Sequence, residues 1–549
     1  MPHHTSCQQQ INGNVIDGFM EGQGIMLQKE SGTYYTPECT VEFMCDYIAE
    51  HKEKSGAILE PSAGDGRFIS ALQKRNYGKF YTAVEYDADK IKELNAKISS
   101  PLTRVIAKDF LQAIKSWERK YDLVIGNPPY INIKNMEESF LQEGRLLCKD
   151  YGLPENLIKN SWVAFILGAM KVLTSSGCIF FVLPMEFLQV KYAEKLRGFL
   201  EEHFDTIHII TFKEKMFPEI EQNTCLVYLT NEEREVPYIC YRQYETLSSK
   251  DVLYQSQIKK NKPLKKWTNA VLSDSDIDLL KTLEGHFEPI SNFASSRPGI
   301  VTGANKIFIL NQAEVERFQC DKFVKPIISK AAMVRNSINI DQDLIDGLAD
   351  AGEKIFFLDL NGINEDDMSR ELIRYLQESG EIKRNNIEIR KSYKCSRRDP
   401  WYAVPVTKSG TAVFFKRYDT IPRICIKPEE IFTTDIAYNL FFKEEIDSES
   451  FAFSFYNSLT LALCEYSGRY YAGGVSELIP EEFKQLSIPY SLIGKDDIEK
   501  LKCMFRKNSS IEDILDFVDN FTLSNTISPK NIMQLRLIRE KLIKRRKSH

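Results

Sequence analysis

The sequence lacks any apolar run long enough to cross a lipid bilayer. The longest such run, residues 162–170, is far shorter than the roughly 20 residues that a membrane-spanning helix needs. The chain also begins without the charged-then-apolar order of a secretion signal, because its first residues are Met-Pro-His-His-Thr-Ser. We therefore expect a cytoplasmic protein that is not inserted in a membrane.

Motifs for metal ions and disulfides are missing as well. Twelve cysteines occur, but no two are spaced as Cys-x-x-Cys, and the seven histidines show no metal-ligand spacing. These absences predict a reduced protein without a zinc site, a disulfide framework or another bound metal. Apolar residues make up 43% and charged residues 27% of the 549 residues, which is typical of a globular chain with two or three domains.

A net excess of positive charge, common in proteins that bind nucleic acids, is also lacking, since the net charge is −5. The basic residues are nevertheless concentrated between residues 381 and 427, where twelve lysines and arginines are opposed by four acidic residues. Aromatic residues alternate with them, and this mixture favours contacts with phosphates, sugars and bases. We select Lys394, Arg397, Arg398 and Trp401 as candidate DNA contacts. The alternative is a solvated charged face over a core.

The most specific motif is a strand followed by Asn127-Pro128-Pro129-Tyr130. Residues 121–126 are largely apolar and predict a buried strand, so the tetrapeptide follows its carboxyl end, where ligands bind in open α/β sheets. Two consecutive prolines stiffen the loop, because each fixes its own φ and restricts the preceding residue. The loop therefore holds an amide, two carbonyl groups and an aromatic ring at fixed relative positions.

These groups suit a site that methylates an exocyclic amine, such as that of adenine. The lone pair of this nitrogen is delocalised into the ring, so the amine is a poor nucleophile. If the Asn127 side-chain oxygen and the Pro128 carbonyl accept both N–H bonds, the nitrogen moves towards tetrahedral geometry and its developing positive charge is stabilised. Tyr130 can stack on the base. The alternative is a rigid Asn-Pro loop that only ends a strand.

A glycine-rich turn follows the first predicted strand, residues 57–60. Gly64 and Gly66 permit a tight turn and a close approach of the backbone to a ligand, and Ala63 precedes them. Glu60, at the end of the strand, would repel a pyrophosphate but suits a ligand with an ammonium group, such as the methionine part of S-adenosylmethionine. We assign Glu60, Ala63, Gly64 and Gly66 to cofactor binding.

Acidic residues also follow the next two predicted strands, 81–85 and 104–107. Glu85 can accept hydrogen bonds from both hydroxyls of a ribose. Asp109 can accept from an adenine amino group, and Phe110 can pack on the adenine ring. Each carboxylate alone fits an exposed or helix-capping residue. Three of them at successive strand ends, followed by Asn-Pro-Pro-Tyr, indicate one nucleotide site.

In this order of motifs the chain resembles the gamma-class, or Taq-type, N6-adenine DNA methyltransferases of restriction-modification systems. The resemblance is carried by Gly32-Thr-Tyr-Tyr-Thr-Pro37, Glu60-Pro-Ser-Ala-Gly-Asp-Gly66, Glu85, Asp109-Phe110 and Asn127-Pro-Pro-Tyr130. It implies that Thr36 and Pro37 touch the cofactor S-adenosyl-L-methionine and that Phe217 packs against a flipped adenine. The other interpretation of Phe217 is a core aromatic residue. Segments 299–309 and 470–489 resemble the two ends of the family's target-recognition region.

The element pattern predicts an α/β fold: a Rossmann-like S-adenosylmethionine-dependent methyltransferase domain with a mainly parallel sheet, then a mixed α+β target-recognition domain and C-terminal helices. We place an N-terminal arm at 1–30, the catalytic domain at 31–235, a lysine-rich linker at 236–270, the recognition domain at 271–490 and two helices at 491–549. Further strands are expected at 178–183, 207–211, 224–229, 306–310, 354–359, 412–415 and 423–427. The basic residues 541–547 predict a frayed helix end.

The resulting hypothesis is a site-specific methyltransferase that rotates an adenine out of duplex DNA and methylates its N6 amine. As the modification enzyme of a restriction-modification system, it would act beside a separate cognate endonuclease. An RNA methyltransferase, or a protein methyltransferase acting on glutamine, is the alternative, because the latter also uses Asn-Pro-Pro-Tyr, although the carboxyl-terminal region would then be unexplained. A fused methylase-endonuclease is a weaker alternative, because no segment of nuclease size is left unassigned.

Overall fold

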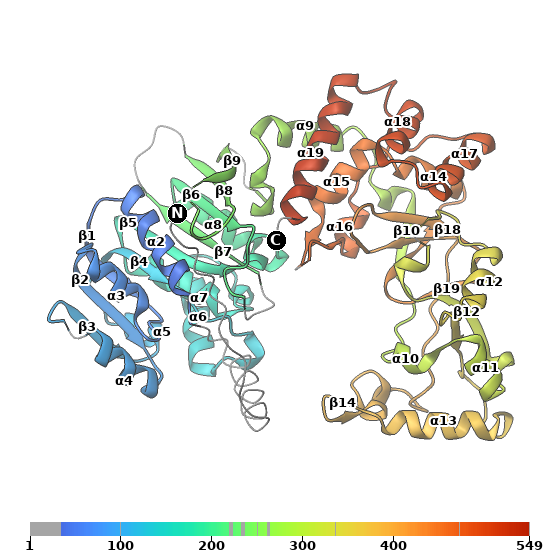
Figure 1. Cartoon of the computed structure of the whole chain (residues 1–549), viewed down its shortest axis with the longest axis horizontal. Coiled ribbons are helices and arrows are strands. Elements are labelled where there is room, and N and C mark those ends of the chain that lie inside the picture. Colours follow the sequence, from blue (N-terminus) through green and yellow to red (C-terminus); the bar gives the residue numbers. More distant parts are fainter. Residues whose placement is uncertain are drawn as a thin grey trace, which may run out of the picture. The chain divides into compact units, whose positions relative to one another are not determined.

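The computed structural model describes residues 35–98, 100–218, 223–231, 237–249, 251–260, 264–334, 336–471 and 473–547. The arm expected at 1–30, and the first three residues of the motif at 32–37, lie outside these described residues. The chain divides after Val271 into two compact units (Figure 1). No helix in the described ranges is long and apolar enough to span a bilayer.

Unit 1 contains one nine-stranded sheet. Its strands are β1 (Ser55–Glu60), β2 (Gly78–Glu85), β3 (Thr103–Ala107), β4 (Tyr121–Gly126), β5 (Leu173–Pro184), β6 (Thr206–Phe212), β7 (Thr224–Thr230), β8 (Tyr238–Tyr244) and β9 (Val252–Lys259). The strand order is β3-β2-β1-β4-β5-β7-β6-β8-β9. Pairing is parallel from β3 to β5 and between β6 and β8, and antiparallel around β7 and at β9. The predicted Rossmann-like, mainly parallel sheet is confirmed.

The strand order reverses at β1, because β2 and β3 lie on one side of it and β4 on the other. At such a reversal the carboxyl ends of neighbouring parallel strands open a crevice, which is where ligands bind in these sheets. Glu60, Glu85 and Gly126 are the last residues of β1, β2 and β4. Parallel pairing therefore brings two acidic strand ends and the Asn-Pro-Pro-Tyr loop to one edge.

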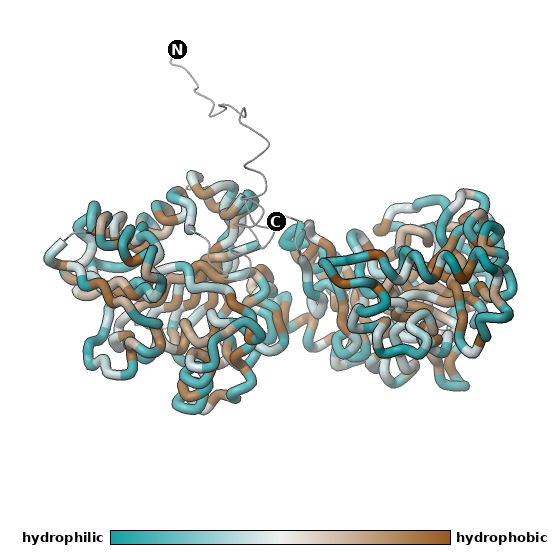
Figure 2. Tube along the Cα trace, turned by 90° about the horizontal axis from the view of Figure 1, so that it is seen from below, coloured by the Kyte–Doolittle hydropathy of each residue, from teal (hydrophilic) through white to brown (hydrophobic). Residues whose placement is uncertain are grey.

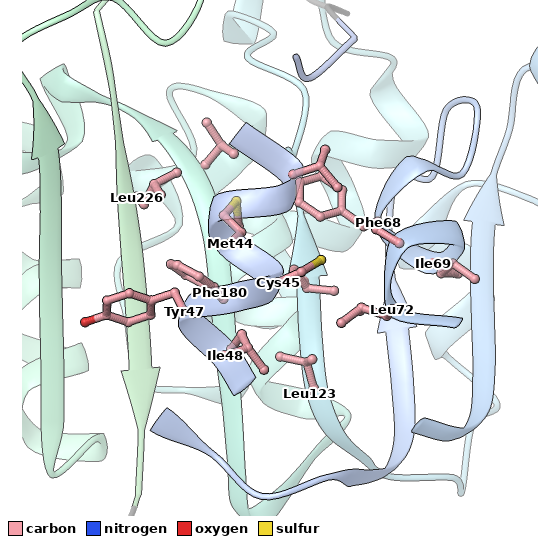
Figure 3. Close-up of a cluster of buried hydrophobic side chains, with 14 of the residues drawn as sticks. Met44, Cys45, Tyr47, Ile48, Phe68, Ile69, Leu72, Leu123, Phe180 and Leu226 are labelled. Atoms are coloured by element: carbon pink, nitrogen blue, oxygen red, sulfur yellow. The ribbon is translucent and has the colours of Figure 1, made fainter. Parts of the chain in front are cut away.

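Helices of unit 1 bury apolar faces against this sheet. The helices are α2 (Glu38–His51), α3 (Arg67–Lys74), α4 (Ala88–Lys97), α5 (Phe110–Ile114), α6 (Glu138–Asp150), α7 (Ser161–Lys171) and α8 (Glu194–His203). Met44, Cys45 and Ile48 recur at helical spacing on α2 and pack over Leu123 and Phe180 of the sheet (Figure 3). Residues 161–169 of α7 are all buried, so this part of the helix is held firmly in the core.

The described part of 236–270 corrects the expected linker. It contributes β8 and β9 to the sheet and ends in the 3-10 helix η5 (Trp267–Val271). Its lysine-rich composition suggested a linker, but most of its lysines follow β9, which is an edge strand with a largely exposed face. Trp267 is fully buried and donates a 2.6 Å hydrogen bond to Glu201, which ties this segment to α8.

Unit 2 is built from small sheets and many helices. Its strands are β10 (Ala294–Pro298), β11 (Ile309–Leu310), β12 (Val324–Ile328), β13 (Phe356–Leu358), β14 (Lys383–Arg384), β15 (Ile387–Glu388), β16 (Ala412–Phe415), β17 (Arg417–Tyr418), β18 (Arg423–Ile426), β19 (Phe432–Thr433), β20 (Ala437–Phe442), β21 (Arg469–Tyr470) and β22 (Ser476–Glu477). They form sheets β10-β20-β16-β18, β11-β13-β12-β19 and β17-β22-β21 and the hairpin β14-β15. In both units hydrophobic residues gather in the interior (Figure 2).

The helices of unit 2 are α9 (Asp274–Glu284), α10 (Asn305–Phe308), α11 (Gln312–Phe318), α12 (Gln342–Asp350), α13 (Arg370–Glu381), α14 (Ser448–Phe455), α15 (Ser458–Ser467), α16 (Pro480–Lys484), α17 (Lys495–Arg506), α18 (Ile511–Thr522) and α19 (Pro529–Lys547). The strand expected at 306–310 is wrong in its first half. There the N–H groups of Ile307 and Phe308 both bond to the Ala304 carbonyl, which closes a helical turn before β11.

The carboxyl-terminal segment also differs from expectation. It forms three helices, α17 to α19, instead of two, and its basic end is not frayed. Arg546 is fully buried, and it donates 2.8 Å and 2.9 Å hydrogen bonds to the two carboxylate oxygens of Glu465 on α15. The run of charges suggested a solvated end, because a sequence does not show that a buried carboxylate lies opposite one of its arginines.

Candidate active site

One pocket at the carboxyl edge of β1, β2 and β4 gathers nearly all of the site residues predicted in unit 1. Its wall includes Thr36, Glu60, Ala63, Gly64, Glu85, Asp109, Phe110, Asn127, Pro128, Pro129, Tyr130 and Phe217. Among the described residues, no group of three metal-ligating side chains is assembled there or elsewhere.

Two predicted cofactor residues, Pro37 and Gly66, are not part of this wall, and both shape the backbone instead. The carbonyl of Pro37 accepts the N–H groups that begin α2. Gly66 has φ 76° and precedes α3, and a Cβ at this position would lie 2.1 Å from the Cδ1 atom of Ile98. Glycine is therefore required here by the close packing of the turn as well as by its left-handed conformation.

Glu60 is a buried carboxylate with an acidic environment. Its side chain is 2% exposed and accepts a 3.3 Å hydrogen bond from the N–H of Ile69. Burial raises the pKa of Glu60 well above its usual range, and the charges of Asp65 and Glu85 raise it further. No lysine, arginine or histidine of the described ranges pairs with it. A buried acid that faces a pocket without a cation of its own fits an incoming ammonium group.

Glu85 connects the glycine-rich turn to the end of β2. One of its oxygens accepts the N–H of Gly64 at 2.8 Å, and the other accepts those of Tyr86 at 2.9 Å and Asp87 at 3.0 Å. These bonds fix the carboxylate at the pocket wall. Two carboxylate oxygens offer about four acceptor positions, and three are used, so one position, on the oxygen that bonds Gly64, is left for a ribose hydroxyl.

Asp109 and Phe110 stand at the start of α5. Asp109 caps this helix, because its Oδ1 atom accepts the N–H of Gln112 at 3.1 Å, and burial raises its pKa. Phe110 is 2% exposed and stacks on Phe165 with ring centres 5.4 Å apart. Gly168 leaves room for this ring, since a Cβ there would lie 2.8 Å from Phe110. The two residues form a rigid, partly apolar wall of the pocket.

The segment before α2 lies against the glycine-rich turn. Arg67 donates a 2.7 Å hydrogen bond to the Thr36 carbonyl, forms an ion pair with Asp65, and places its guanidinium 5.1 Å from the centre of the Tyr35 ring. Thr36 itself is buried and Tyr35 is partly exposed. One arginine therefore joins the amino-terminal motif to the turn that carries Gly64.

The Asn-Pro-Pro-Tyr loop is held by its own side chains. The Tyr130 hydroxyl donates a 3.0 Å hydrogen bond to Asn127 Oδ1. Burial raises the pKa of Tyr130 well above its usual value, so the hydroxyl stays protonated and remains a donor at neutral pH. This bond fixes the direction of the amide oxygen. Because an amide oxygen has two lone pairs, Asn127 can still accept the N–H of a substrate amine.

Two serines outside the motif hold the loop from opposite sides. Ser62, in the glycine-rich turn, donates a 3.1 Å hydrogen bond to the Asn127 carbonyl. Ser161, the first residue of α7, donates to the Pro129 carbonyl and accepts the N–H of Ile131 at 2.9 Å. The loop is therefore held both by the glycine-rich turn and by the buried beginning of α7.

Replacing Ser161 with alanine should lower kcat for methyl transfer by about tenfold and leave the dissociation constant of the methyl donor unchanged. The substitution leaves a carbonyl and an N–H of the loop without their partner, at a cost of about 1–3 kcal/mol, and the loop then loses its alignment. Single-turnover transfer and calorimetric donor binding measure the two quantities, with exposed Ser175→Ala as the control. An unchanged kcat, or a loss seen only in donor binding, would contradict this positioning role.

The position of Phe217 is compatible with both interpretations of its sequence, a core aromatic residue and a contact for a flipped adenine. It is 6% exposed and is part of the main core cluster of unit 1, and one edge of it also lines the pocket. A contact with a substrate base stays a prediction.

Two of the residues predicted to contact DNA, Arg398 and Trp401, make contacts within unit 2. Arg398 donates hydrogen bonds of 2.8 Å and 3.0 Å to the carbonyls of Thr302 and Val301. Trp401 is half-buried, with its ring centre 5.8 Å from that of Phe308. Both side chains are therefore engaged with the protein, and a DNA contact by Arg398 or Trp401 stays a prediction.

The other two, Lys394 and Arg397, are exposed. The guanidinium of Arg397 lies 3.9 Å from the centre of the Tyr393 ring, which is itself 70% exposed. A flat pair of arginine and tyrosine at the surface keeps the charge accessible and offers a stacking face. Lys394 and Arg397 therefore stay candidates for DNA contact.

The motifs do not identify three aromatic residues that also line the pocket, Tyr86, Phe140 and Phe165. Tyr86 directly follows Glu85, and its place after a strand end is a signal that could have selected it. Phe140 and Phe165 come from α6 and α7, where nothing in the sequence distinguishes them from core aromatics. Their place at the pocket depends on how these two helices pack against each other and against α5.

Two family models match the chain. Residues 64–217 match the Eco57I restriction-modification methylase, and residues 264–523 match the C-terminal domain of the type II methyltransferase M.Eco57I. The first match covers the turn from Gly64, the ends of β2 and β4 and the Asn-Pro-Pro-Tyr loop described above. The second covers most of unit 2. Between them the matches account for most of the chain.

Individual proteins agree with this assignment. The type II methyltransferase M.AccI of Acinetobacter calcoaceticus is 21% identical over 90% of this chain and 92% of its own. M.HincII of Haemophilus influenzae is 33% identical, over 36% of each chain. A solved structure of the type IIL restriction-modification enzyme MmeI in complex with DNA shares the fold, with a TM-score of 0.54 and 12% identity over 96% of this chain and 73% of that one. The chain thus belongs to the Eco57I family of type II restriction-modification DNA methyltransferases.

Proposed function

We propose that the protein methylates the N6 amine of an adenine that has been rotated out of duplex DNA. The observation that carries this proposal is the single pocket in which the Asn127 loop meets Glu60, Glu85 and Asp109. Rotation is required because an amine inside the base stack cannot reach a donor held in a protein pocket. The loop supplies acceptors for an amine, and the three acids supply acceptors for a nucleoside that carries an ammonium.

S-adenosyl-L-methionine is the cofactor of this family and, when bound, supplies a methyl group on a positively charged sulfur. We assign the ammonium to Glu60, which is buried without a cation of its own in the described part of the chain. Glu85 accepts from a ribose hydroxyl, through the position that its three backbone N–H bonds leave open, and Asp109 from the adenine amine. The remaining wall is assigned to Thr36, Ala63, Gly64 and Phe110, with Pro37 and Gly66 holding the backbone in position.

Asn127 and Pro128 act on the substrate amine. Asn127 Oδ1, held by Tyr130, and the Pro128 carbonyl accept the two N–H groups. Both acceptors are neutral, so the amine does not have to lose a proton before it attacks. Their dipoles stabilise the positive charge that develops on the nitrogen, and because the loop is already rigid this needs no reorganisation. The Tyr130 ring, and the edge of Phe217, are assigned to the face of the base.

We assign sequence recognition to unit 2, with the catalytic domain extending from residue 31 through Val271 because β8 and β9 belong to its sheet. The recognition domain then covers 272–490 and the helical segment 491–549. Support comes from the exposed, basic surroundings of Lys394 and Arg397. A separate restriction endonuclease is assigned the cleavage of unmodified DNA.

Incubation with tritium-labelled donor and duplex DNA, RNA or total protein tests the proposal. We expect label in DNA alone. After enzymatic digestion of that DNA, the labelled nucleoside should co-elute with N6-methyl-2′-deoxyadenosine. Label in cytosine, in RNA or in glutamine would overturn it. Cleavage of unmethylated DNA by the purified protein in magnesium would contradict the separate endonuclease.

A further inference from the structure

A small hairpin between α13 and the Tyr393 segment projects from unit 2 (Figure 1). β14 and β15 pair with Lys383 opposite Glu388 and Arg384 opposite Ile387. The two residues between the strands, Asn385 and Asn386, have φ values of 51° and 61°. Left-handed conformations at both central residues define the tight turn that matches the twist of a hairpin, and asparagine tolerates them well. The tip is therefore a defined ribbon.

One face of this ribbon carries exposed apolar side chains. Residues opposite each other on paired strands share a face, so Arg384 and Ile387 lie together, and Ile382 follows the same alternation. Ile382 is 53% and Ile387 54% exposed. A partner that covers such side chains removes apolar surface from water, which is favourable, so two exposed isoleucines at a projecting tip favour a partner.

The charge around these isoleucines is positive and largely uncompensated. Glu388 is already paired with Arg390 at 2.8 Å and Lys391 at 2.9 Å. Lys383 and Arg384 are exposed and form no ion pair with any acid in the described ranges, and the same holds for Lys394 and Arg397. An apolar pair with two such cations on its own hairpin, and two more in the segment that follows it, fits a polyanion with an apolar interior.

The base of the ribbon is rigid. Gly380, near the end of α13, lies against Trp401, because a Cβ at this glycine would be 3.0 Å from the indole ring. The N–H of Ile389 bonds to the Ile382 carbonyl at 2.9 Å and closes the open end of the hairpin. Trp401 therefore packs against the end of α13, from which the hairpin starts, and this contact accounts for its half-buried position. These contacts fix the position of the exposed hairpin tip relative to the rest of unit 2.

We infer that the β14–β15 hairpin enters a groove of duplex DNA, with Ile382 and Ile387 against base edges and Lys383, Arg384, Lys394 and Arg397 on the flanking phosphates. Two-stranded ribbons fit the major groove, where apolar side chains contact thymine methyl groups, and exposed lysine and arginine side chains neutralise the backbone. The inference rests on the proposed function and names the element of unit 2 that reads the DNA. A protein partner of comparable shape would need a strongly acidic surface.

Two double variants of the full-length protein test it. In Lys383→Ala/Arg384→Ala, affinity for duplex DNA should fall, and the slope of log affinity against log salt should decrease by about two, because each substitution removes one cation from a phosphate. In Ile382→Ala/Ile387→Ala, methylation of the parent's preferred sites should fall by about 10- to 100-fold, because apolar contacts with base edges are lost. The salt slope should stay unchanged, because no charge is removed. Fluorescence anisotropy measures binding, and sequencing of methylated plasmid DNA measures site use.

Controls separate this inference from the proposed function. Arg317→Ala/Lys322→Ala removes the same charge from exposed positions of unit 2 outside the hairpin, and Leu492→Ala removes a side chain that is 77% exposed. Both controls should bind and methylate like the parent. If the parent methylates DNA and the hairpin variants match it in affinity, salt slope and site use, the hairpin inference is wrong and the proposed function stands. If the parent neither binds nor methylates DNA, the proposed function itself fails.

Discussion

Replacing Asn127 with alanine should lower kcat for methyl transfer by about 10²- to 10³-fold, the loss seen when one preorganised polar group is removed from a transition state. Affinities for the methyl donor and for DNA should stay within about twofold of the parent, because the proposed role of the side chain is at the substrate amine and not at the donor or the duplex backbone. Rapid-quench transfer under single-turnover conditions, together with calorimetry for the donor, measures both.

The reason for this large effect lies in the geometry of the loop. Asn127 Oδ1 is fixed by the Tyr130 hydroxyl at 3.0 Å, and the Asn127 carbonyl is fixed by Ser62 at 3.1 Å. An acceptor that is already in place stabilises developing charge without reorganisation. Exposed Asn95→Ala in α4 is the matched control and should be neutral. A variant at Asn127 that keeps more than a few per cent of the parent kcat would show that this amide does not hold the amine.

Replacing Glu60 with glutamine should weaken donor binding by about 30-fold or more, because losing one partner of a buried charge pair costs about 2–5 kcal/mol. The parent should also lose donor affinity as the pH falls, since protonation of Glu60 removes the charge that attracts the ammonium. Burial raises the pKa of Glu60 well above its usual value, so this loss should begin at a higher pH than for an exposed glutamate. Calorimetric titrations at several pH values measure it.

The same substitution should stabilise the protein without its donor. An acid whose pKa is raised in the folded state binds its proton more tightly there than in the unfolded chain. The parent therefore loses stability as the pH rises from the unfolded value, about 4.3, through the raised folded value. Glutamine does not ionise, so the melting temperature of the variant should exceed that of the parent near pH 8, and this advantage should shrink towards pH 4.

Asp65, in the glycine-rich turn that follows Glu60, is a control whose substitution should change the melting temperature in the opposite direction. Burial alone would raise its pKa, but hydrogen bonds from Lys97 and Arg67 outweigh burial and hold it below the usual value. Asp65→Asn should therefore destabilise the protein at neutral pH, and the difference from the parent should disappear as the pH falls through the depressed pKa. If Glu60→Gln and Asp65→Asn changed the melting temperature in the same direction, the electrostatic account of this turn would be wrong.

The sequence by itself determined the catalytic edge of unit 1. Strands β1, β2 and β4 are short apolar runs that end at Gly, Pro or an acid, and such local signals do not depend on distant parts of the chain. Once these runs are parallel neighbours, their carboxyl ends must meet. For this reason Glu60, Glu85 and the loop at Asn127 could be selected together before their positions in space were known.

Only the tertiary structure decided which other residues serve this edge and which charges are exposed. Ser161 and Phe165 reach the pocket because α7 packs against α5, α6 and β5, and no local pattern encodes those contacts. Arg546 and Arg398 stand in basic runs that resemble solvated surface, yet one is buried against Glu465 and the other is bonded to two carbonyls. The physical reason is that a charged side chain is buried or exposed according to the partner it meets across space. The local sequence shows only which residues are the neighbours of that side chain along the chain.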